Sequence, residues 1–173
     1  MPKDQPNLMP GAEGVGPDIY SHAIPTDERE WVPARNFPGD NLNVWIRPLM
    51  FNTVTGAGAN LLRIRGSGVV SRHLHTGPVQ GFVLKGSWRY LEHDWVAREG
   101  DYIYEPAGEV HTLVVDEGVE EMMTYFTALG TVMFVDDKDE VVGYEDIFKR
   151  KAMCRAHYRE MGLDESYLDR ITR

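Results

Sequence analysis

The sequence predicts an all-β fold, an antiparallel sandwich or barrel, preceded by an irregular arm and followed by helices. Between residues 41 and 135, short segments rich in β-branched and aromatic residues alternate with turns that contain Gly, Pro or Asp. After residue 135 the apolar spacing becomes helical. A length of 173 residues, with 42% apolar and 26% charged residues, suits one globular domain with a sizeable core.

Residues 1–40 form the expected arm, because they are rich in Pro, Gly, Asp and Asn, which favour turns and supply few core contacts. Within this arm, Asp27 and Glu30 can cap one short helical turn.

The barrel is expected at 41–135, because its segments are as short as strands and carry the residue types enriched in strands. The segments are NVWIRPLMFN (43–52), ANLLRIR (59–65), GVVSRHLH (68–75), GFVLKGSWRYLE (81–92), DWVAREGDYIYEP (94–106), VHTLVV (110–115) and EMMTYFTALGTVMFV (121–135).

Residues 136–173 are expected to form a helical tail that belongs to the same domain. Ile147, Cys154, Tyr158 and Met161 fall near one face of a helix, and Gly162 can end it. Asp164 can then cap a last short helix.

Charge and composition exclude several classes of function. With 27 acidic against 18 basic residues and a net charge of −9, the chain is not expected to bind nucleic acid. Cys154 is the only cysteine, so no intrachain disulfide can form. No segment approaches the roughly 20 apolar residues of a membrane span, and no signal peptide is recognisable. A cytoplasmic protein that acts on a small molecule is expected.

Three histidines have the spacing of a metal site. His73 and His75 lie two residues apart on a predicted strand, so their side chains share a face, with α-carbons about 6.5–7 Å apart. The segment GDYIYEPAGEVH (100–111) ends at a third histidine, His111, whose direction depends on the bend around Pro106 and Gly108. The other histidines, His22, His93 and His157, are assigned to the surface or to an interface.

The HxH pair and the pattern Gly, five residues, PxG, two residues, His resemble the two motifs of the cupin superfamily. That resemblance implies a jelly-roll barrel with His73, His75 and His111 as metal ligands. The carboxylate ligand of many cupins would fall at Val79 or Gln80, and neither is an anion. Three neutral imidazoles leave a divalent ion with its full charge, which favours an anionic chelating substrate. Gln80 can then hydrogen-bond the substrate or a metal-bound water. Imidazole suits Fe, Zn, Cu and Ni, so ligand type leaves the metal open.

A narrower resemblance extends over most of the chain. The arm (16–33), the strand RPLMFN (47–52), the segment 90–115 and the tail 143–163 are similar to the 2,4'-dihydroxyacetophenone dioxygenase family. The resemblance implies an Fe(II) site, with Zn possible, and O₂-dependent cleavage of an aromatic α-hydroxyketone into 4-hydroxybenzoate and formate. Acetylacetone-cleaving cupins are more distantly similar, and their glutamate near the metal corresponds to Glu105, a candidate catalytic group. Tyr104 is a candidate for the substrate pocket.

Two alternatives remain open at this point. The chain can be a cupin dioxygenase for another diketone or hydroxyketone, or a non-catalytic Zn-binding sensory cupin such as those joined to anti-sigma factors. Because cupin barrels commonly pair and the arm and tail suit the covering of strand edges, a homo-oligomer, dimer or tetramer, is expected.

Overall fold

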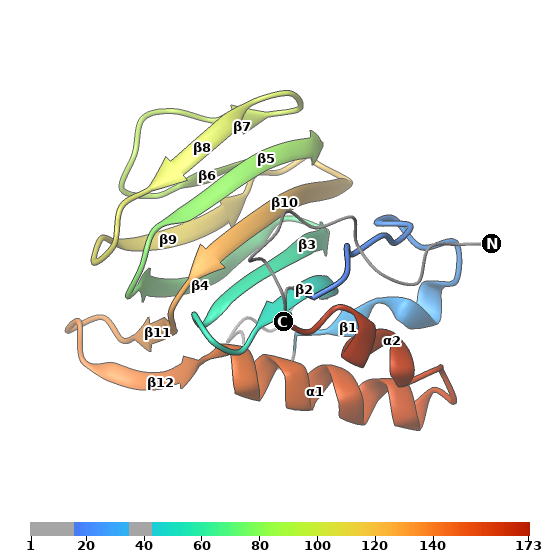
Figure 1. The fold of residues 1–173 in the computed structure, drawn as a ribbon. Helices are drawn as coiled ribbons and strands as arrows, with labels where there is room; N and C mark the ends of the chain where they lie inside the picture. The colour runs from blue at the N-terminus through green and yellow to red at the C-terminus, as the bar shows by residue number, and fades with distance from the viewer. Residues whose placement is uncertain (1–15, 35–42) are drawn as a thin grey trace, which may run out of the picture.

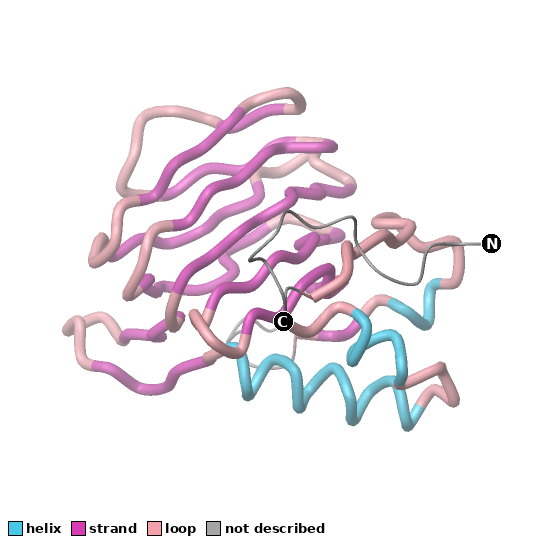
Figure 2. Tube along the Cα trace, in the orientation of Figure 1, coloured by secondary structure: helices cyan, strands magenta, loops and turns pink. Residues whose placement is uncertain are grey.

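The computed structural model describes residues 16–34 and 43–173, and in it two antiparallel six-stranded sheets face each other (Figures 1 and 2). The first sheet has the order β1 (Val32–Pro33), β2 (Asn43–Asn52), β3 (Ala57–Arg65), β10 (Glu121–Leu129), β5 (Val79–Lys85) and β8 (Tyr102–Glu105). The second has the order β12 (Val141–Glu145), β11 (Val132–Val135), β4 (Gly68–His75), β9 (Val110–Val115), β6 (Ser87–Tyr90) and β7 (Ala97–Arg98). The predicted all-β class is confirmed.

The core lies between the two sheets, because strand residues alternate between the inside and the outside of the fold. Leu62 and Ile64 of β3 and Met122 of β10 are among the buried residues that meet Trp88 and Tyr90 of β6. The indole nitrogen of Trp88 donates a hydrogen bond to Thr124 Oγ1 at 2.9 Å, so the polar atom of this fully buried ring is paired.

Two helices follow the barrel, α1 (Ile147–Glu160) and α2 (Ser166–Arg170), and α1 lies along β1 and β2 (Figure 1). Asp146 begins α1 by accepting a hydrogen bond from Lys149 N at 2.8 Å. The buried face of α1 contains Ile147, Cys154 and Tyr158, as expected. The fourth buried residue of α1 is His157, whereas Met161 is half-buried. His157 Nε2 lies 2.8 Å from the carbonyl oxygen of Arg29 in the arm, which covers this residue.

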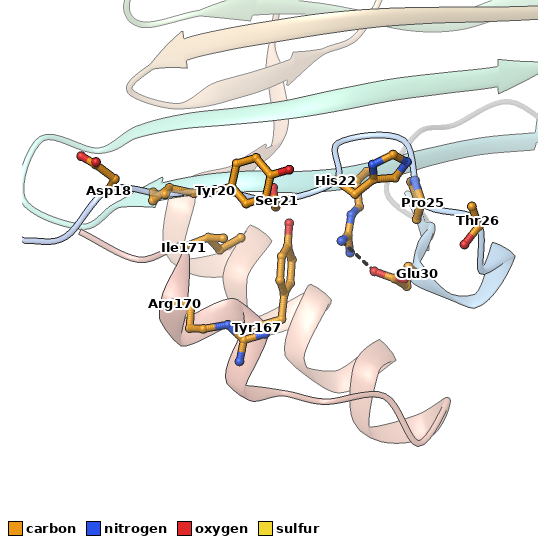
Figure 3. A pocket seen from close by; sticks show the side chains of 12 residues that line it. Asp18, Tyr20, Ser21, His22, Pro25, Thr26, Glu30, Tyr167, Arg170 and Ile171 are labelled. Atoms are coloured by element: carbon orange, nitrogen blue, oxygen red, sulfur yellow. Dashed lines mark ion pairs between the residues drawn. The ribbon is translucent and has the colours of Figure 1, made fainter. Parts of the chain in front are cut away.

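The arm contains the expected helical turn, η1 (Glu28–Glu30), and Asp27 caps it through the backbone N–H of Arg29. Arg47 of β2 fastens this turn to the barrel, since its buried guanidinium forms a 2.6 Å ion pair with Glu30 (dashed in Figure 3). The same guanidinium lies 4.2 Å from the ring centroid of Tyr167, which extends from α2 toward the arm. A polar hollow between the arm and α2 surrounds this junction.

The final helix starts one residue later than expected. Glu165 is the N-terminal flanking residue of α2 and makes no capping bond, whereas Asp164 accepts a hydrogen bond from Ser166 N at 3.0 Å. Among the described residues, none of the helices is long and apolar enough to cross a membrane.

Two glycines with positive φ provide a test of the close approach between β5 and β10. At Gly86 an added Cβ would lie 2.3 Å from the carbonyl oxygen of Glu121, whereas at Gly118 it would meet nothing within 4 Å. Gly118→Ala is expected to cost about 1–2 kcal/mol of unfolding free energy through backbone strain alone. Gly86→Ala should cost about 1–3 kcal/mol more because of the clash. Urea denaturation measures both variants, and equal losses would contradict the contact.

Candidate metal centre

The three predicted histidines meet on the inner face of the second sheet. His73 and His75 lie two residues apart on β4, and His111 of β9 is directly opposite His73 in the strand register. One ligand nitrogen from each residue lies within 4.8 Å of the other two. The ring centroids are 4.7 Å apart for His73 and His111, and 5.0 Å apart for His73 and His75. The structure therefore brings together the three side chains that the sequence motifs indicated.

The bend before β9 is attached directly to β4. Gly108 has a φ of +85°, which glycine adopts readily, and its backbone N–H donates to the carbonyl oxygen of His75 at 2.8 Å. Because β9 starts two residues later, this bond helps to set the position from which His111 enters the site.

The three imidazoles are neutral at ordinary pH. Burial lowers the pKa of His73 to about 4, that of His111 to about 3 and that of His75 to about 2. Neutral imidazole has the lone pair that a metal ion needs. Nδ1 of His73 lies 3.2 Å from Ser71 Oγ and 3.4 Å from Ser71 O, a contact that leaves Nε2 free to act as the ligand atom.

Buried polar atoms without partners show that these residues fit a metal ion. Within the described part of the chain, neither ring nitrogen of His111 has a hydrogen-bond partner, and neither does Oε2 of Glu105. Such atoms are costly in an interior unless something binds them. A divalent ion held by the three histidines would bind one of the two ring nitrogens of His111.

Glu105 lies beside the histidines, and only 3% of it is exposed. Its Oε2 is 3.5 Å from His75 Nε2 and 3.6 Å from His111 Nε2, but these are not ion pairs, because the imidazoles are neutral. Tyr90 donates a 2.7 Å hydrogen bond to Oε1 and stacks on His111, with ring centroids 3.9 Å apart. Burial raises the pKa of Glu105 to about 7, against the opposing effect of the Tyr90 hydrogen bond.

A cavity extends from the histidines between the two sheets, with mostly apolar walls. Glu105 and Tyr90 line it next to the metal ligands, and Asn60 and Arg150 contribute further polar groups. The apolar lining consists of Ile46, Leu62, Val70, Val79, Leu113, Phe126, Ala128 and Val132. No spacing or metal-ligand pattern in the sequence marks Tyr90, Asn60 or Arg150 as site residues.

The structure does not bring Gln80 or Tyr104 to the cavity. The two residues are directly opposite each other on β5 and β8, and both are exposed on the outer face of the first sheet. Tyr102 donates a 3.2 Å hydrogen bond to Gln80 Oε1 on that face. Val79 and Glu105, one residue away on the same strands, point inward because successive strand residues alternate in direction.

The remaining histidines lie apart from the cluster. His22 is exposed in the arm, and His157 contacts the arm from α1. His93 is half-buried rather than fully solvated, since it stacks on Trp95 and its Nε2 lies 3.1 Å from Glu109 Oε1.

Residues 21–133 match the family model of the ChrR cupin-like domain, which covers more than half of the chain. The chain belongs to this cupin family. Among solved structures, an RmlC-like cupin protein from Ralstonia eutropha is 28% identical, with a TM-score of 0.72 over 83% of this chain and 91% of that chain. An acetylacetone dioxygenase from Acinetobacter johnsonii is 18% identical, with a TM-score of 0.68 over 83% of this chain and 97% of that chain. At that identity the second likeness shows the fold alone. A search of curated proteins gave no match.

The double variant His73→Ala/His75→Ala should lose metal binding while the cupin barrel stays folded. Removing a residue that merely orients a ligand costs about 10–100-fold in metal affinity, so the loss of two ligands should cost more than that. Competition with a chelator followed by metal analysis measures the effect. His93→Ala is the matched control and should bind metal like the wild type. Equal binding by the double variant would rule out this cluster as the site.

The ionisation of Glu105 should make the metal-free protein less stable as pH rises. The folded-state pKa of about 7 lies above the ordinary value of 4.5, so its stabilising contribution is complete below pH 4.5 and is lost as pH rises through 7. When the pH is raised from 5 to 8, the unfolding free energy of Glu105→Gln should therefore rise by roughly 1–3 kcal/mol relative to that of the wild type. Urea denaturation in EDTA at both pH values tests this, and parallel pH profiles would contradict it.

Proposed function

We propose that this cupin is a non-heme Fe(II) dioxygenase that cleaves the C–C bond of an aromatic α-hydroxyketone. The proposed reaction converts 2,4'-dihydroxyacetophenone and O₂ into 4-hydroxybenzoate and formate. The observation that carries the proposal is a buried set of three neutral histidines beside a buried carboxyl group, at a mainly apolar cavity.

The charge of the ligand set favours a substrate that binds as an anion. His73, His75 and His111 carry no charge, so a divalent ion bound there keeps its full formal charge. An α-hydroxyketone can offer two adjacent oxygens and becomes an electron-rich enediolate when it loses a proton. Fe(II) would supply a Lewis-acidic centre with open coordination positions, where such a substrate and O₂ can react.

Glu105 is the proposed base that removes this proton. A carboxylate is a common general base, and Oε2 of Glu105 lies 3.5 Å from His75 Nε2 and 3.6 Å from His111 Nε2, next to the place where the substrate would bind. Tyr90 holds Oε1 by donating its hydroxyl hydrogen, because burial keeps the pKa of this phenol well above its usual value. Oε2 remains without a partner and lies on the side of the histidines, where the substrate would bind.

The apolar walls would bind the aromatic ring and keep water away from the reacting carbon atoms. Ile46 and Leu62 reach the cavity from the first sheet, Val132 reaches it from the second, and Phe126 offers an aromatic ring to the substrate. Gln80 has no direct part in this proposal, because it lies on the outer face of the first sheet.

Oxygen consumption by anaerobically Fe(II)-loaded protein tests the proposed reaction. Uptake is expected with 2,4'-dihydroxyacetophenone, with one formate formed for each O₂ consumed, and no uptake is expected from Zn-loaded protein. Uptake with acetylacetone alone would indicate that the substrate is a diketone and that the same site acts on it. If no iron-loaded sample consumes O₂, the dioxygenase proposal fails and a Zn-binding sensory role is favoured.

A homo-oligomer is the proposed assembly, and the outer face of β5 and β8 is its proposed contact. Phe82, Tyr102 and Tyr104 are 43–61% exposed on this face, an unusual concentration of large apolar groups in water. Tyr104→Glu should shift the protein from oligomer to monomer in light scattering coupled to gel filtration. Val54→Glu, at an even more exposed apolar residue elsewhere, should leave the mass unchanged. A monomeric wild type would contradict the proposal.

A further inference from the structure

A polar group of three residues lies along the cavity where β3, β12 and α1 meet. Asn60 of β3 and Arg150 of α1 line the cavity, and Glu145 ends β12. Arg150 Nη1 donates to Asn60 Oδ1 at 2.8 Å, and Arg150 Nε donates to Glu145 Oε1 at 2.5 Å. Asn60 and Glu145 are only 7% and 5% exposed, so these polar atoms lie in the interior.

The contact with Arg150 determines which way the Asn60 amide points. A guanidinium group can only donate hydrogen bonds, so the atom of Asn60 that faces it must be the oxygen. The amide nitrogen of Asn60 therefore lies on the other side, and no hydrogen bond from it is found among the residues that the structure describes; because it is not one of the fully buried unpaired atoms, it keeps some accessible surface. In a cavity lined mainly by aliphatic groups, this leaves a fixed donor that suits an oxygen acceptor on a ligand.

The charge of the group favours a neutral acceptor. Arg150 Nη2 lies 2.5 Å from Glu145 Oε1, the same oxygen that Nε contacts, so a buried carboxylate balances the guanidinium charge. A ligand carboxylate would add an uncompensated negative charge in a poorly hydrated site, which is costly. A phenol or carbonyl oxygen would satisfy the Asn60 donor without that cost.

The strand register places this group at a suitable distance from the histidines. His75 is opposite Val132 of β11, and Val132 is opposite Glu145 of β12. Two strand spacings, roughly 10 Å, therefore separate the His75 and Glu145 backbones. Asn60 and Arg150 line the same cavity as His73 and His75, so a phenyl ketone bound at the histidines by its carbonyl end can point its para substituent toward them.

We propose that Asn60, oriented by Arg150, determines specificity by donating a hydrogen bond to a neutral oxygen para to the ketone group of an aromatic substrate. This inference deepens the proposed function and rests on it for the ketone end of the ligand. Glu145 acts through Arg150 and is a positioning residue.

Binding to the Zn-loaded wild type, with no turnover, tests the inference by calorimetry. The probes are 4'-hydroxyacetophenone, acetophenone and 4-acetylbenzoate. The wild type should bind the hydroxy ketone about tenfold more tightly than acetophenone, and 4-acetylbenzoate no better than acetophenone. In Asn60→Leu, the affinities for 4'-hydroxyacetophenone and acetophenone should differ by no more than about twofold. Acetophenone binding as tight as in the wild type shows that the cavity of this variant is intact.

Asn60→Asp is a second variant that keeps an acceptor for Arg150 and replaces the donor with an oxygen, so it too should lose the preference for the hydroxy ketone. The inference is overturned if either folded variant keeps the wild-type preference, or if the wild type shows none. Failure of the proposed reaction is a separate result, because it appears as absent O₂ uptake by iron-loaded protein. A binding preference that depends on Asn60 would stand in that case.

Discussion

The pairing of β4 with β9 is the constraint on which the rest of the site depends. It sets His73 opposite His111 on the inner face of a sheet, and the two-residue period of β4 adds His75. The opposite sheet covers all three, so desolvation keeps the imidazoles neutral, with their lone pairs available. Strand register and burial together produce a set of metal ligands from side chains that would be partly protonated in mildly acidic water.

The same burial explains the unusual carboxyl group. Glu105 ends β8 on the inside of the barrel, where ionisation is disfavoured, and its neighbours are neutral histidines that offer it no positive charge. Tyr90 both stabilises one carboxyl oxygen and covers the face of His111. Tyr90 thus contacts both the proposed base and a metal ligand, so substitutions in β6 would affect both residues.

The C-terminal tail contributes to the cavity as well as to the core. The barrel alone supplies the histidines, Glu105 and Asn60, but the group that orients Asn60 comes from α1. The position of α1 depends on its buried face and on Arg47 of β2. Arg47 contacts Tyr158 of α1, Tyr167 of α2 and Glu30 of the arm. The described part of the arm and the C-terminal helices are therefore linked to the cavity through packed residues of the fold.

The sequence by itself determined the fold class and the three histidines, and its resemblance to acetylacetone-cleaving cupins pointed to Glu105. Period-two spacing, turn residues and the PxG bend are local patterns, so they can be recognised without knowing which distant residues are in contact. Only the tertiary structure decided which neighbours face the site. A shift of one residue along a strand exchanges inside for outside, so Val79 faces the cavity and Gln80 does not, and likewise Glu105 and Tyr104. Tyr90, Asn60 and Arg150 meet only through pairing between strands and helices far apart in the chain, which no local pattern records.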